Sequence, residues 1–376
     1  MKSQNKYSTV VIDAGSGLIK AGFGGEDGPR SIFNSIVGTP KQMELMVGME
    51  LQNRYVGDNA ITRYEIMNFS YPIQRGEVTD WDKYENLMHY LLYSEMRVVP
   101  EEISILITEG PRTSRKNREK LTEILFETFN VKRLHIANSS MVGLYSYGKT
   151  SGLIVDSGYN VTSTVPVYEG YPLAHASLKI NIGGEDLSKN LLSMITDKLD
   201  ETYVDMKGRF LADDIKEKLG FVLLNQDDAD DVKDSTYELP DGKKIELGSE
   251  LYKANEILFN PDEDIQKEKG VMPLKNMVVD SINKCDDEIK NDIKENICLT
   301  GGTTLLKNFP EKLRMELSDN KDMGSFNLSF VPERQFSSWI GGSIMSSLDN
   351  FQYMWVTKEE FDEKGKTLIS IDSKCF

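Results

Sequence analysis

Two short glycine-containing segments combine an aspartate with the residue types that bind phosphate groups. Residues 13–20 read DAGSGLIK and residues 156–162 read DSGYNVT, and each follows an apolar run rich in β-branched side chains. This pattern predicts the turn of a β-hairpin, with Asp13 or Asp156 at the end of its first strand. Glycine lets the backbone turn tightly and bring its N–H groups close to an anion. The carboxylate can hold a divalent cation through water.

The repetition of this pattern carries more information than either copy. A single Asp-x-Gly is common in ordinary Asx turns. Here the two aspartates lie 156 − 13 = 143 residues apart in matching contexts. We therefore expect a duplicated domain whose halves bind the phosphates of one nucleotide from both sides.

Length and composition indicate a soluble globular protein. With 376 residues, 39% of them hydrophobic and 28% charged, the chain is long enough for two domains. No apolar run reaches about 18 residues and residues 1–7 are polar, so we expect neither a membrane-spanning helix nor a signal peptide. Three cysteines are too few for a disulfide framework and fit a reducing cytosol.

The charge balance argues against several kinds of partner. A net charge of −16 and an isoelectric point of about 4.8 disfavour direct binding to nucleic acid or to anionic membranes. The same acidity is equally consistent with solubility, basic partners or divalent cations. The three histidines form no spaced cluster with cysteine, so the sequence does not predict a zinc site.

The elements around the two turns alternate between strands and helices. Apolar periodicity predicts helices over residues 81–96 and 115–129, and continuous apolar runs predict strands over 103–108 and 134–137. This order implies a parallel or mixed sheet with helices packed against it. The second half repeats the hairpin and then places helices after residues 183–186 and after the glycine-rich turn at 300–304, a site suited to a nucleotide's sugar or phosphate.

One segment has no clear period. Residues 42–48 mix methionine, leucine and valine with polar residues. Two interpretations stay open: an exposed loop that binds a partner, or a partly buried connection between strands.

The whole chain resembles the actin family. Residues 13–20, 156–162 and 300–304 are similar to its two phosphate loops and its adenosine loop. Further matching motifs are residues 20–24, 71–73, 117–120, 126–131, 168–171, 214–219, 237–242, 332–334, 339–344, 354–355 and 374–376.

The resemblance implies an α/β fold of the actin type. Two related domains would each contain a mixed sheet flanked by helices, with a nucleotide cleft between them. The implied subdivision is residues 1–34, 72–146 and 337–376 for the base of the outer domain, 35–71 for its tip, 147–182 and 270–336 for the base of the inner domain, and 183–269 for its tip.

The resemblance also implies a site for ATP or ADP with Mg²⁺ or Ca²⁺. Asp13 and Asp156 would hold the cation through water and would organise hydrolysis. The phosphate-binding residues would be Gly15, Ser16, Gly17, Leu18, Lys20, Gly158, Tyr159, Asn160 and Val161. The adenosine-binding residues would be Gly184, Lys216, Glu217, Gly301, Gly302, Thr303, Leu305 and Gln335.

The chain departs from the family where hydrolysis takes place. Ser139 stands where the family has a glutamine that positions the attacking water, and Ser163 stands where it has a histidine. Tyr159 and Asn160 replace the last two residues of its Asp-Ser-Gly-Asp-Gly loop. Because phosphoryl transfer depends mainly on positioning, we expect slow hydrolysis rather than lost binding, the alternative being that neighbouring groups take over.

Other departures affect the adenosine side and the surface. Gln335, Leu306 and Asp213 stand where the family has a lysine, a tyrosine and an arginine. Residues 262–269 are strongly charged where the family has an apolar plug between filament strands, and burying that charge unpaired would be costly. The remaining changes are Glu44, Arg75 and the loss of an acidic tail at residues 2–6.

One partner surface is similar to the family's apolar groove for amphipathic helices. Its residues would be Tyr145, Tyr171, Ile344, Met345, Leu348 and Met354. The alternative interpretation is that these side chains belong to the core beneath the C-terminal helix.

We therefore expect an ATP-binding cytoskeletal protein that forms or joins filaments in the cytoplasm, with at most a weak assembly-linked ATPase activity. Its partners would be copies of itself, other actin-family subunits and groove-binding proteins. The main alternative is an actin-related structural subunit of a fixed complex, in which nucleotide is mainly structural. A sugar kinase or chaperone ATPase would share the phosphate loops but not the other motifs.

Overall fold

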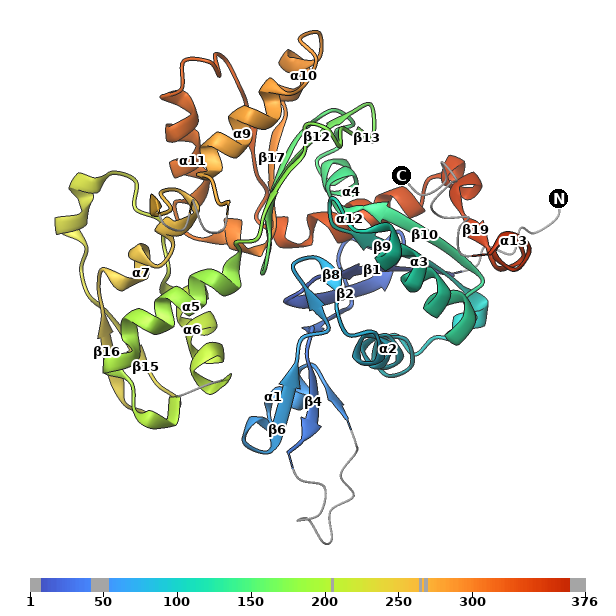
Figure 1. Cartoon of the computed structure of the whole chain (residues 1–376), viewed down its shortest axis with the longest axis horizontal. Coiled ribbons are helices and arrows are strands. Elements are labelled where there is room, and N and C mark those ends of the chain that lie inside the picture. Colours follow the sequence, from blue (N-terminus) through green and yellow to red (C-terminus); the bar gives the residue numbers. More distant parts are fainter. Residues whose placement is uncertain (1–7, 42–53, 204–205, 264–265, 267–269, 366–376) are drawn as a thin grey trace, which may run out of the picture. The chain divides into compact units, whose positions relative to one another are not determined.

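The structure is a computed structural model and describes residues 8–41, 54–203, 206–263, 266 and 270–365. Its internal contacts divide the chain into two units. The first unit consists of Met1–Thr150, Val167–Ala174 and Phe336–Phe376, and the second of Ser151–Pro166 and His175–Gln335. Both units contain sheets flanked by helices, so the expected α/β class is confirmed (Figure 1). The finer division into four parts stays a prediction.

A six-stranded mixed sheet forms the centre of the first unit. Three neighbouring strands run parallel and the others pair antiparallel to them. In spatial order they are β19 (Val356–Thr357), β10 (Arg133–Asn138), β9 (Ile103–Glu109), β1 (Ser8–Ala14), β2 (Leu18–Phe23) and β3 (Ser31–Asn34).

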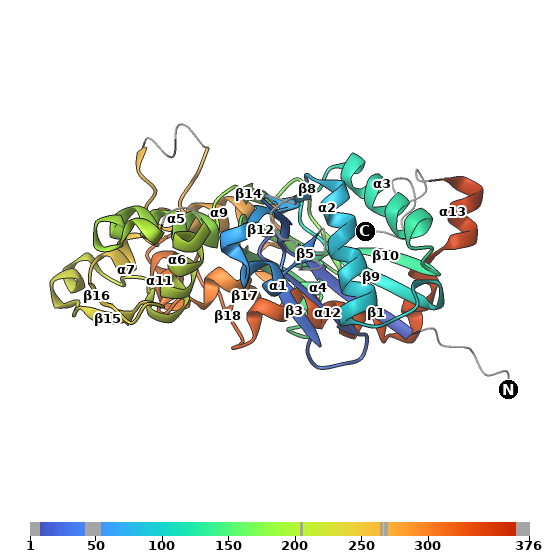
Figure 2. The same ribbon diagram turned by 90° about the horizontal axis from the view of Figure 1, so that it is seen from below.

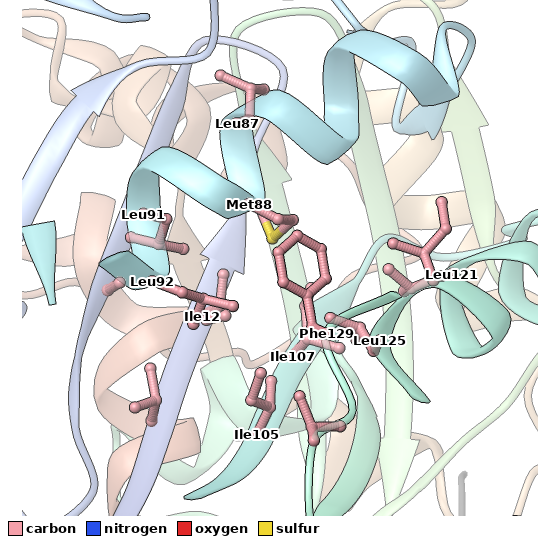
Figure 3. Close-up of a cluster of buried hydrophobic side chains, with 14 of the residues drawn as sticks. Ile12, Leu87, Met88, Leu91, Leu92, Ile105, Ile107, Leu121, Leu125 and Phe129 are labelled. Carbon is pink, nitrogen blue, oxygen red and sulfur yellow. The ribbon is translucent and has the colours of Figure 1, made fainter. Parts of the chain in front are cut away.

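One face of this sheet is covered by α2 (Trp81–His89) and α3 (Arg115–Glu123). Alternate strand residues such as Ile12 and Ile107 point to that face and belong to one buried cluster with Met88 and Leu125 (Figure 3). Strand side chains alternate between faces, so the intervening residues point the other way.

The opposite face is covered by α4 (Ser139–Tyr145) and α12 (Ser337–Ser346), which pack on each other. The indole Nε1 of Trp339 donates a hydrogen bond to the carbonyl oxygen of Val11 at 3.0 Å and ties α12 to β1. Gly341 allows a very close approach, because a Cβ placed there would lie 1.5 Å from the carbonyl oxygen of Val142.

The two predicted helices over 81–96 and 115–129 are present, but each changes geometry partway. Asp80 and Ser114 cap their N-termini by accepting from backbone N–H groups. After α2 and α3 the chain widens into π-helical turns, Tyr90–Glu95 and Ile124–Thr128. The apolar pattern of the sequence does not distinguish an α-helix from a π-helical turn here, because the side chains on the same side of the segment are buried in both.

Smaller elements complete the first unit. They are β4 (Val37–Pro40), β5 (Tyr55–Val56), α1 (Asp58–Ile61), β6 (Met67–Ser70), β7 (Ile73–Gln74), β8 (Glu77–Val78), β13 (Tyr171–Pro172) and α13 (Lys358–Lys364).

The sheet of the second unit repeats the hairpin and its parallel neighbour. In it β11 pairs with β17 in parallel, and β14 pairs with β12 in antiparallel fashion. The strands are β11 (Gly152–Ser157), β12 (Thr162–Tyr168), β14 (Leu178–Ile180), β17 (Ile297–Thr300) and β18 (Leu328–Ser329). The sheet has β13 as its sixth strand, which pairs antiparallel with the last two residues of β12, Val167 and Tyr168, and those residues are counted with the first unit.

The helices of the second unit form two groups. The first packs on the sheet through Leu153, Val155 and Leu299, and consists of α9 (Leu274–Asn283), α10 (Lys290–Lys294) and α11 (Phe309–Ser318). The second packs beside the hairpin β15 (Ser235–Glu238) and β16 (Lys244–Leu247), and consists of α5 (Gly184–Ile195), α6 (Met206–Leu219) and α7 (Glu250–Lys253). In both views α5 and α6 lie side by side (Figures 1 and 2). No helix in the described part of the chain is long and apolar enough to cross a membrane.

Candidate functional site

The first predicted turn joins β1 to β2 as expected. The N–H of Gly15 donates to the carbonyl oxygen of Leu18 at 3.1 Å, and a Cβ on Gly15 would lie 2.9 Å from that oxygen. Within the described residues, no hydrogen bond uses the N–H of Ser16 or of Gly17. Both residues are half-exposed, so these two donors are available to an anion.

The carboxylate of Asp13 is held by two neighbours in one row across the sheet. Asp13 pairs with Lys20 on β2 and with Thr108 on β9. Lys20 Nζ lies 2.9 Å from Asp13 Oδ2, and Thr108 Oγ1 donates to Asp13 Oδ1 at 2.6 Å. The aspartate and lysine side chains are each 14% exposed, so the pair is mostly but not fully withdrawn from water.

The second turn reproduces this arrangement in the other unit. The N–H of Gly158 donates to the carbonyl oxygen of Val161 at 2.9 Å. Asp156 pairs with Thr300 on the parallel strand β17, and Thr300 Oγ1 donates to Asp156 Oδ1 at 2.8 Å. The expectation of two equivalent hairpin turns therefore matches the backbone of each unit.

The two turns differ at the position that carries a lysine in the first turn. The offset of 143 residues places Ser163 where the first turn has Lys20 (20 + 143 = 163). Ser163 is fully buried, and its hydroxyl has no hydrogen-bond partner among the described residues. A buried orphan hydroxyl is uncommon and is suited to bind a water molecule or a ligand oxygen.

Several residues assigned to the nucleotide come together at the second turn. The carbonyl oxygen of Gly158 accepts from the N–H of Gly184 at 2.9 Å and from Thr303 Oγ1 at 2.8 Å. A Cβ on Gly183 would lie 2.7 Å from this oxygen and from the backbone of Tyr159. The turn, the start of α5 and the 3₁₀ helix η9 (Gly302–Leu305) thus share one small region.

The glycine-rich turn after β17 is strained in a way that only glycine tolerates. Gly301 has φ +89°, and a Cβ there would lie 2.3 Å from the carbonyl oxygen of Ser157 and 2.8 Å from Asp156 Oδ1. Its N–H donates to the carbonyl oxygen of Arg334 at 3.2 Å. The predicted helix does not follow directly, because the short η9 intervenes before α11.

Lys216 and Glu217 lie on α6. Lys216 is buried, and its ammonium donates to Gly184 O at 2.8 Å, Ser188 Oγ at 2.8 Å and Asp213 Oδ1 at 3.3 Å. These three acceptors satisfy the three donors of a lysine. Glu217 is exposed at the surface of the same helix.

The remaining predicted residues lie in separate places. Ser139 is the first residue of α4 and is half-buried, and its carbonyl oxygen accepts from Ser338 Oγ at 3.2 Å. Gln335 is half-buried in the second unit, whereas Gly302 and Leu305 are exposed on η9. Leu306, which ends η9, is buried.

The six predicted groove residues all belong to the first unit. Tyr171, Ile344 and Leu348 are exposed, at 71%, 43% and 53%, whereas Met345 is buried. Tyr145 and Met354 are partly buried against the cluster that contains Met345. Burial raises the pKa of the Tyr145 hydroxyl, and the neighbouring Tyr171 adds to the shift.

Some predictions fall wholly or partly outside the described residues. The segment 42–48, Glu44 and the tail 2–6 are among them. Of residues 262–269, the described Asp262, Glu263 and Gln266 are exposed.

Several residues that shape the site were not predicted from the sequence. Thr108 and Thr300 hold the aspartates, and Arg334 donates to Thr304 Oγ1 at 2.9 Å and to Thr304 O at 2.7 Å. Thr108 ends a predicted strand and Thr300 begins the predicted glycine-rich turn at 300–304, and these placements are the one signal in the sequence that could have pointed to them.

The donors at each turn, taken by themselves, are of the kinds that bind phosphate or a hydrated divalent cation. Each unit offers one carboxylate at a turn, and the first also offers a lysine and open N–H groups. Among the described residues, no three His, Cys, Asp or Glu side chains converge to ligate a metal directly. A single carboxylate per turn suits a cation that keeps most of its water.

A comparison with protein families agrees with this geometry. The family model described as Actin matches residues 4–376, essentially the whole chain. Membership at this coverage supports nucleotide binding and is consistent with the two equivalent turns. The chain belongs to the actin family.

Proposed function

We propose that this protein binds ATP with Mg²⁺ or Ca²⁺ through both hairpin turns. The observation that carries the proposal is the equivalence of the turns, in which Asp13 and Asp156 each accept a hydrogen bond from a threonine one strand away. The unengaged N–H groups of Ser16 and Gly17 supply donors for phosphate oxygens.

The chain's own residues would act mainly by positioning. Asp13 and Asp156 would orient water around the cation, which when bound neutralises charge on the phosphates. Lys20 would contribute a point charge beside them. Ser139 and Ser163 are too short to orient an attacking water as a glutamine and a histidine would, so we propose slow hydrolysis.

Calorimetric titration of nucleotide-free protein with ATP tests the binding proposal. Saturable binding is expected in Mg²⁺, with weaker binding when a chelator removes the cation. Bound ATP should also raise the melting temperature, because a ligand specific to the folded state stabilises it. Absence of both effects in Mg²⁺ would overturn the proposal.

A Ser139→Gln variant tests the origin of slow hydrolysis. The longer side chain at the start of α4 restores a group that can orient water, so phosphate release is expected to rise by about 10- to 100-fold. Phosphate release from saturating MgATP is the measurement. Ser193→Gln, the same change at an exposed position of α5, is the matched control and should leave the rate unchanged. A Ser139→Gln rate equal to the wild-type rate would contradict the explanation.

We further propose that the protein works as a cytoskeletal subunit that forms or joins filaments in the cytoplasm. The exposed side chains of Tyr171, Ile344 and Leu348 support an apolar groove for helices of binding proteins. The proposal predicts that the purified protein sediments as polymer in salt and Mg²⁺.

A fixed-complex subunit is the alternative, and the exposed charges of Asp262 and Glu263 favour it, since burying them against a neighbour would be costly. Sedimentation and phosphate release measured on the same sample separate the two. A protein that binds ATP but stays in the supernatant at all concentrations would support the alternative.

A further inference from the structure

The second turn is attached to α5 and α6 through the two residues that depart from the family pattern. The hydroxyl of Tyr159 donates to Asp213 Oδ2 at 3.0 Å and accepts from Arg209 Nη2 at 3.3 Å and Nε at 3.4 Å. The Tyr159 ring lies within 6 Å of both the Arg209 guanidinium (5.8 Å) and the Lys216 ammonium (5.9 Å).

Asn160 is held from the other side. It is 6% exposed, and its Nδ2 donates to Glu185 Oε2. Glu185 in turn pairs with Arg209 through Oε1, and its own N–H donates to the carbonyl oxygen of Tyr159 at 2.7 Å. Tyr159, Arg209, Glu185 and Asn160 therefore form a closed ring of contacts around the tip of the turn.

Asp213 connects this ring to the interior of the unit. Its Oδ2 accepts from Tyr159, while its Oδ1 accepts from Ser188 Oγ at 2.5 Å and from Lys216 Nζ at 3.3 Å. Both oxygens of the carboxylate and all three donors of Lys216 are thus satisfied. Fully satisfied, partly buried networks fix geometry more firmly than their separate bonds suggest.

The first turn has no such attachment. Ser16 makes no side-chain hydrogen bond within the part of the chain that the structure describes, and Gly17 has no side chain. The two turns share a backbone arrangement but differ in how strongly side chains hold their tips.

We propose that Asp213, Arg209 and Glu185 are positioning residues that hold the second turn, through Tyr159 and Asn160, in its anion-binding shape before any ligand arrives. This inference rests on the proposed function, because it assumes that the turn binds phosphate. Ordering the turn in advance removes a cost that would otherwise weaken binding. It also gives Asp213 a role in place of the family's arginine.

A Tyr159→Phe variant removes one hydroxyl and keeps the ring. Two measurements are needed: hydrogen exchange of amides 158–161 in nucleotide-free protein, and the dissociation constant for MgATP. Exchange should become faster at the turn, and binding should weaken by about tenfold, the size expected for one hydrogen bond to a charged group.

Tyr237→Phe is the matched control. Tyr237 also donates its hydroxyl to an α6 aspartate, Asp214, and its ring lies 5.8 Å from Lys218 Nζ. Among the described residues, no hydrogen bond, ion pair or ring contact joins it to the turn. Exchange at the turn and ATP affinity should stay at wild-type values in this variant.

The possible outcomes distinguish a failure of this inference from a failure of the proposed ATP binding. Wild-type exchange at the turn in Tyr159→Phe would overturn the inference, whatever happens to affinity. Equal changes in Tyr159→Phe and Tyr237→Phe would also overturn it. Failure of the wild-type protein to bind MgATP would overturn the proposed function, while exchange in nucleotide-free protein would still report whether the ring holds the turn.

Discussion

A Gly341→Ala variant is expected to melt at least roughly 10 °C below the wild-type protein or to fail to accumulate in soluble form. The added Cβ would lie 1.5 Å from the carbonyl oxygen of Val142 and 2.4 Å from its carbonyl carbon. Both atoms are backbone, so no side-chain rotation can relieve the clash. Because α4 is capped by Asn138 and α12 is tied to β1 through Trp339, neither helix can shift freely.

Thermal unfolding followed by circular dichroism measures this effect. Gly342→Ala is the matched control on the same helix, where the added Cβ would meet Val11 Cγ1 at 3.0 Å and Leu106 Cδ2 at 3.2 Å. Those are side-chain atoms that can move slightly, so its cost should not exceed the range of about 1–3 kcal/mol typical of overpacking. Equal melting temperatures for the two variants would contradict the packing described for α4 and α12.

Replacing Lys20 by methionine is expected to weaken MgATP binding by about 10- to 100-fold, the range for loss of one or two charge-assisted hydrogen bonds. The variant removes the positively charged ammonium group of Lys20, which lies on the strand that follows the open N–H groups of the first turn. It also leaves Asp13 with Thr108 as its remaining side-chain partner, so the carboxylate loses its neutralising charge in a mostly buried position. We expect a lower melting temperature in nucleotide-free protein as well.

Lys83→Met provides the comparison, because the Lys83–Asp80 pair has the same 2.9 Å separation but is 34% exposed on both sides. More exposed pairs contribute little to stability. This control should bind MgATP as the wild type does and should melt close to it. Wild-type affinity in Lys20→Met, measured by calorimetry, would exclude Lys20 from the phosphate site.

Local signals were sufficient to predict the two turns. Glycine at positions 15 and 158, after a β-branched strand, leaves few backbone alternatives, and the observed hydrogen bonds to Leu18 and Val161 follow directly. The helices over 81–96 and 115–129 were predictable for a similar reason, since each contains its own apolar stripe and its own cap.

Contacts between distant segments were not predictable from the sequence. The sequence identifies Tyr159 as a replacement in a phosphate loop but not as the centre of a side-chain network, because nothing local shows that Asp213 and Arg209, 50 or more residues away, lie beside its hydroxyl. The parallel register that puts Thr108 opposite Asp13 depends on how β9 packs. Such pairings are set by tertiary packing, and the apolar periodicity of a single sequence does not reveal them.

Each aspartate–threonine hydrogen bond joins the two ends of a long chain segment, and these two segments differ in length. Asp13 and Thr108 are 95 residues apart, whereas Asp156 and Thr300 are 144 apart, yet the two rows have the same geometry. In polymer terms, lengthening a closed loop by this ratio costs only about 0.4 kcal/mol of chain entropy. The longer connection in the second unit therefore costs almost nothing in chain entropy, and the segments between the paired residues can differ in length while the aspartate–threonine hydrogen bond is kept.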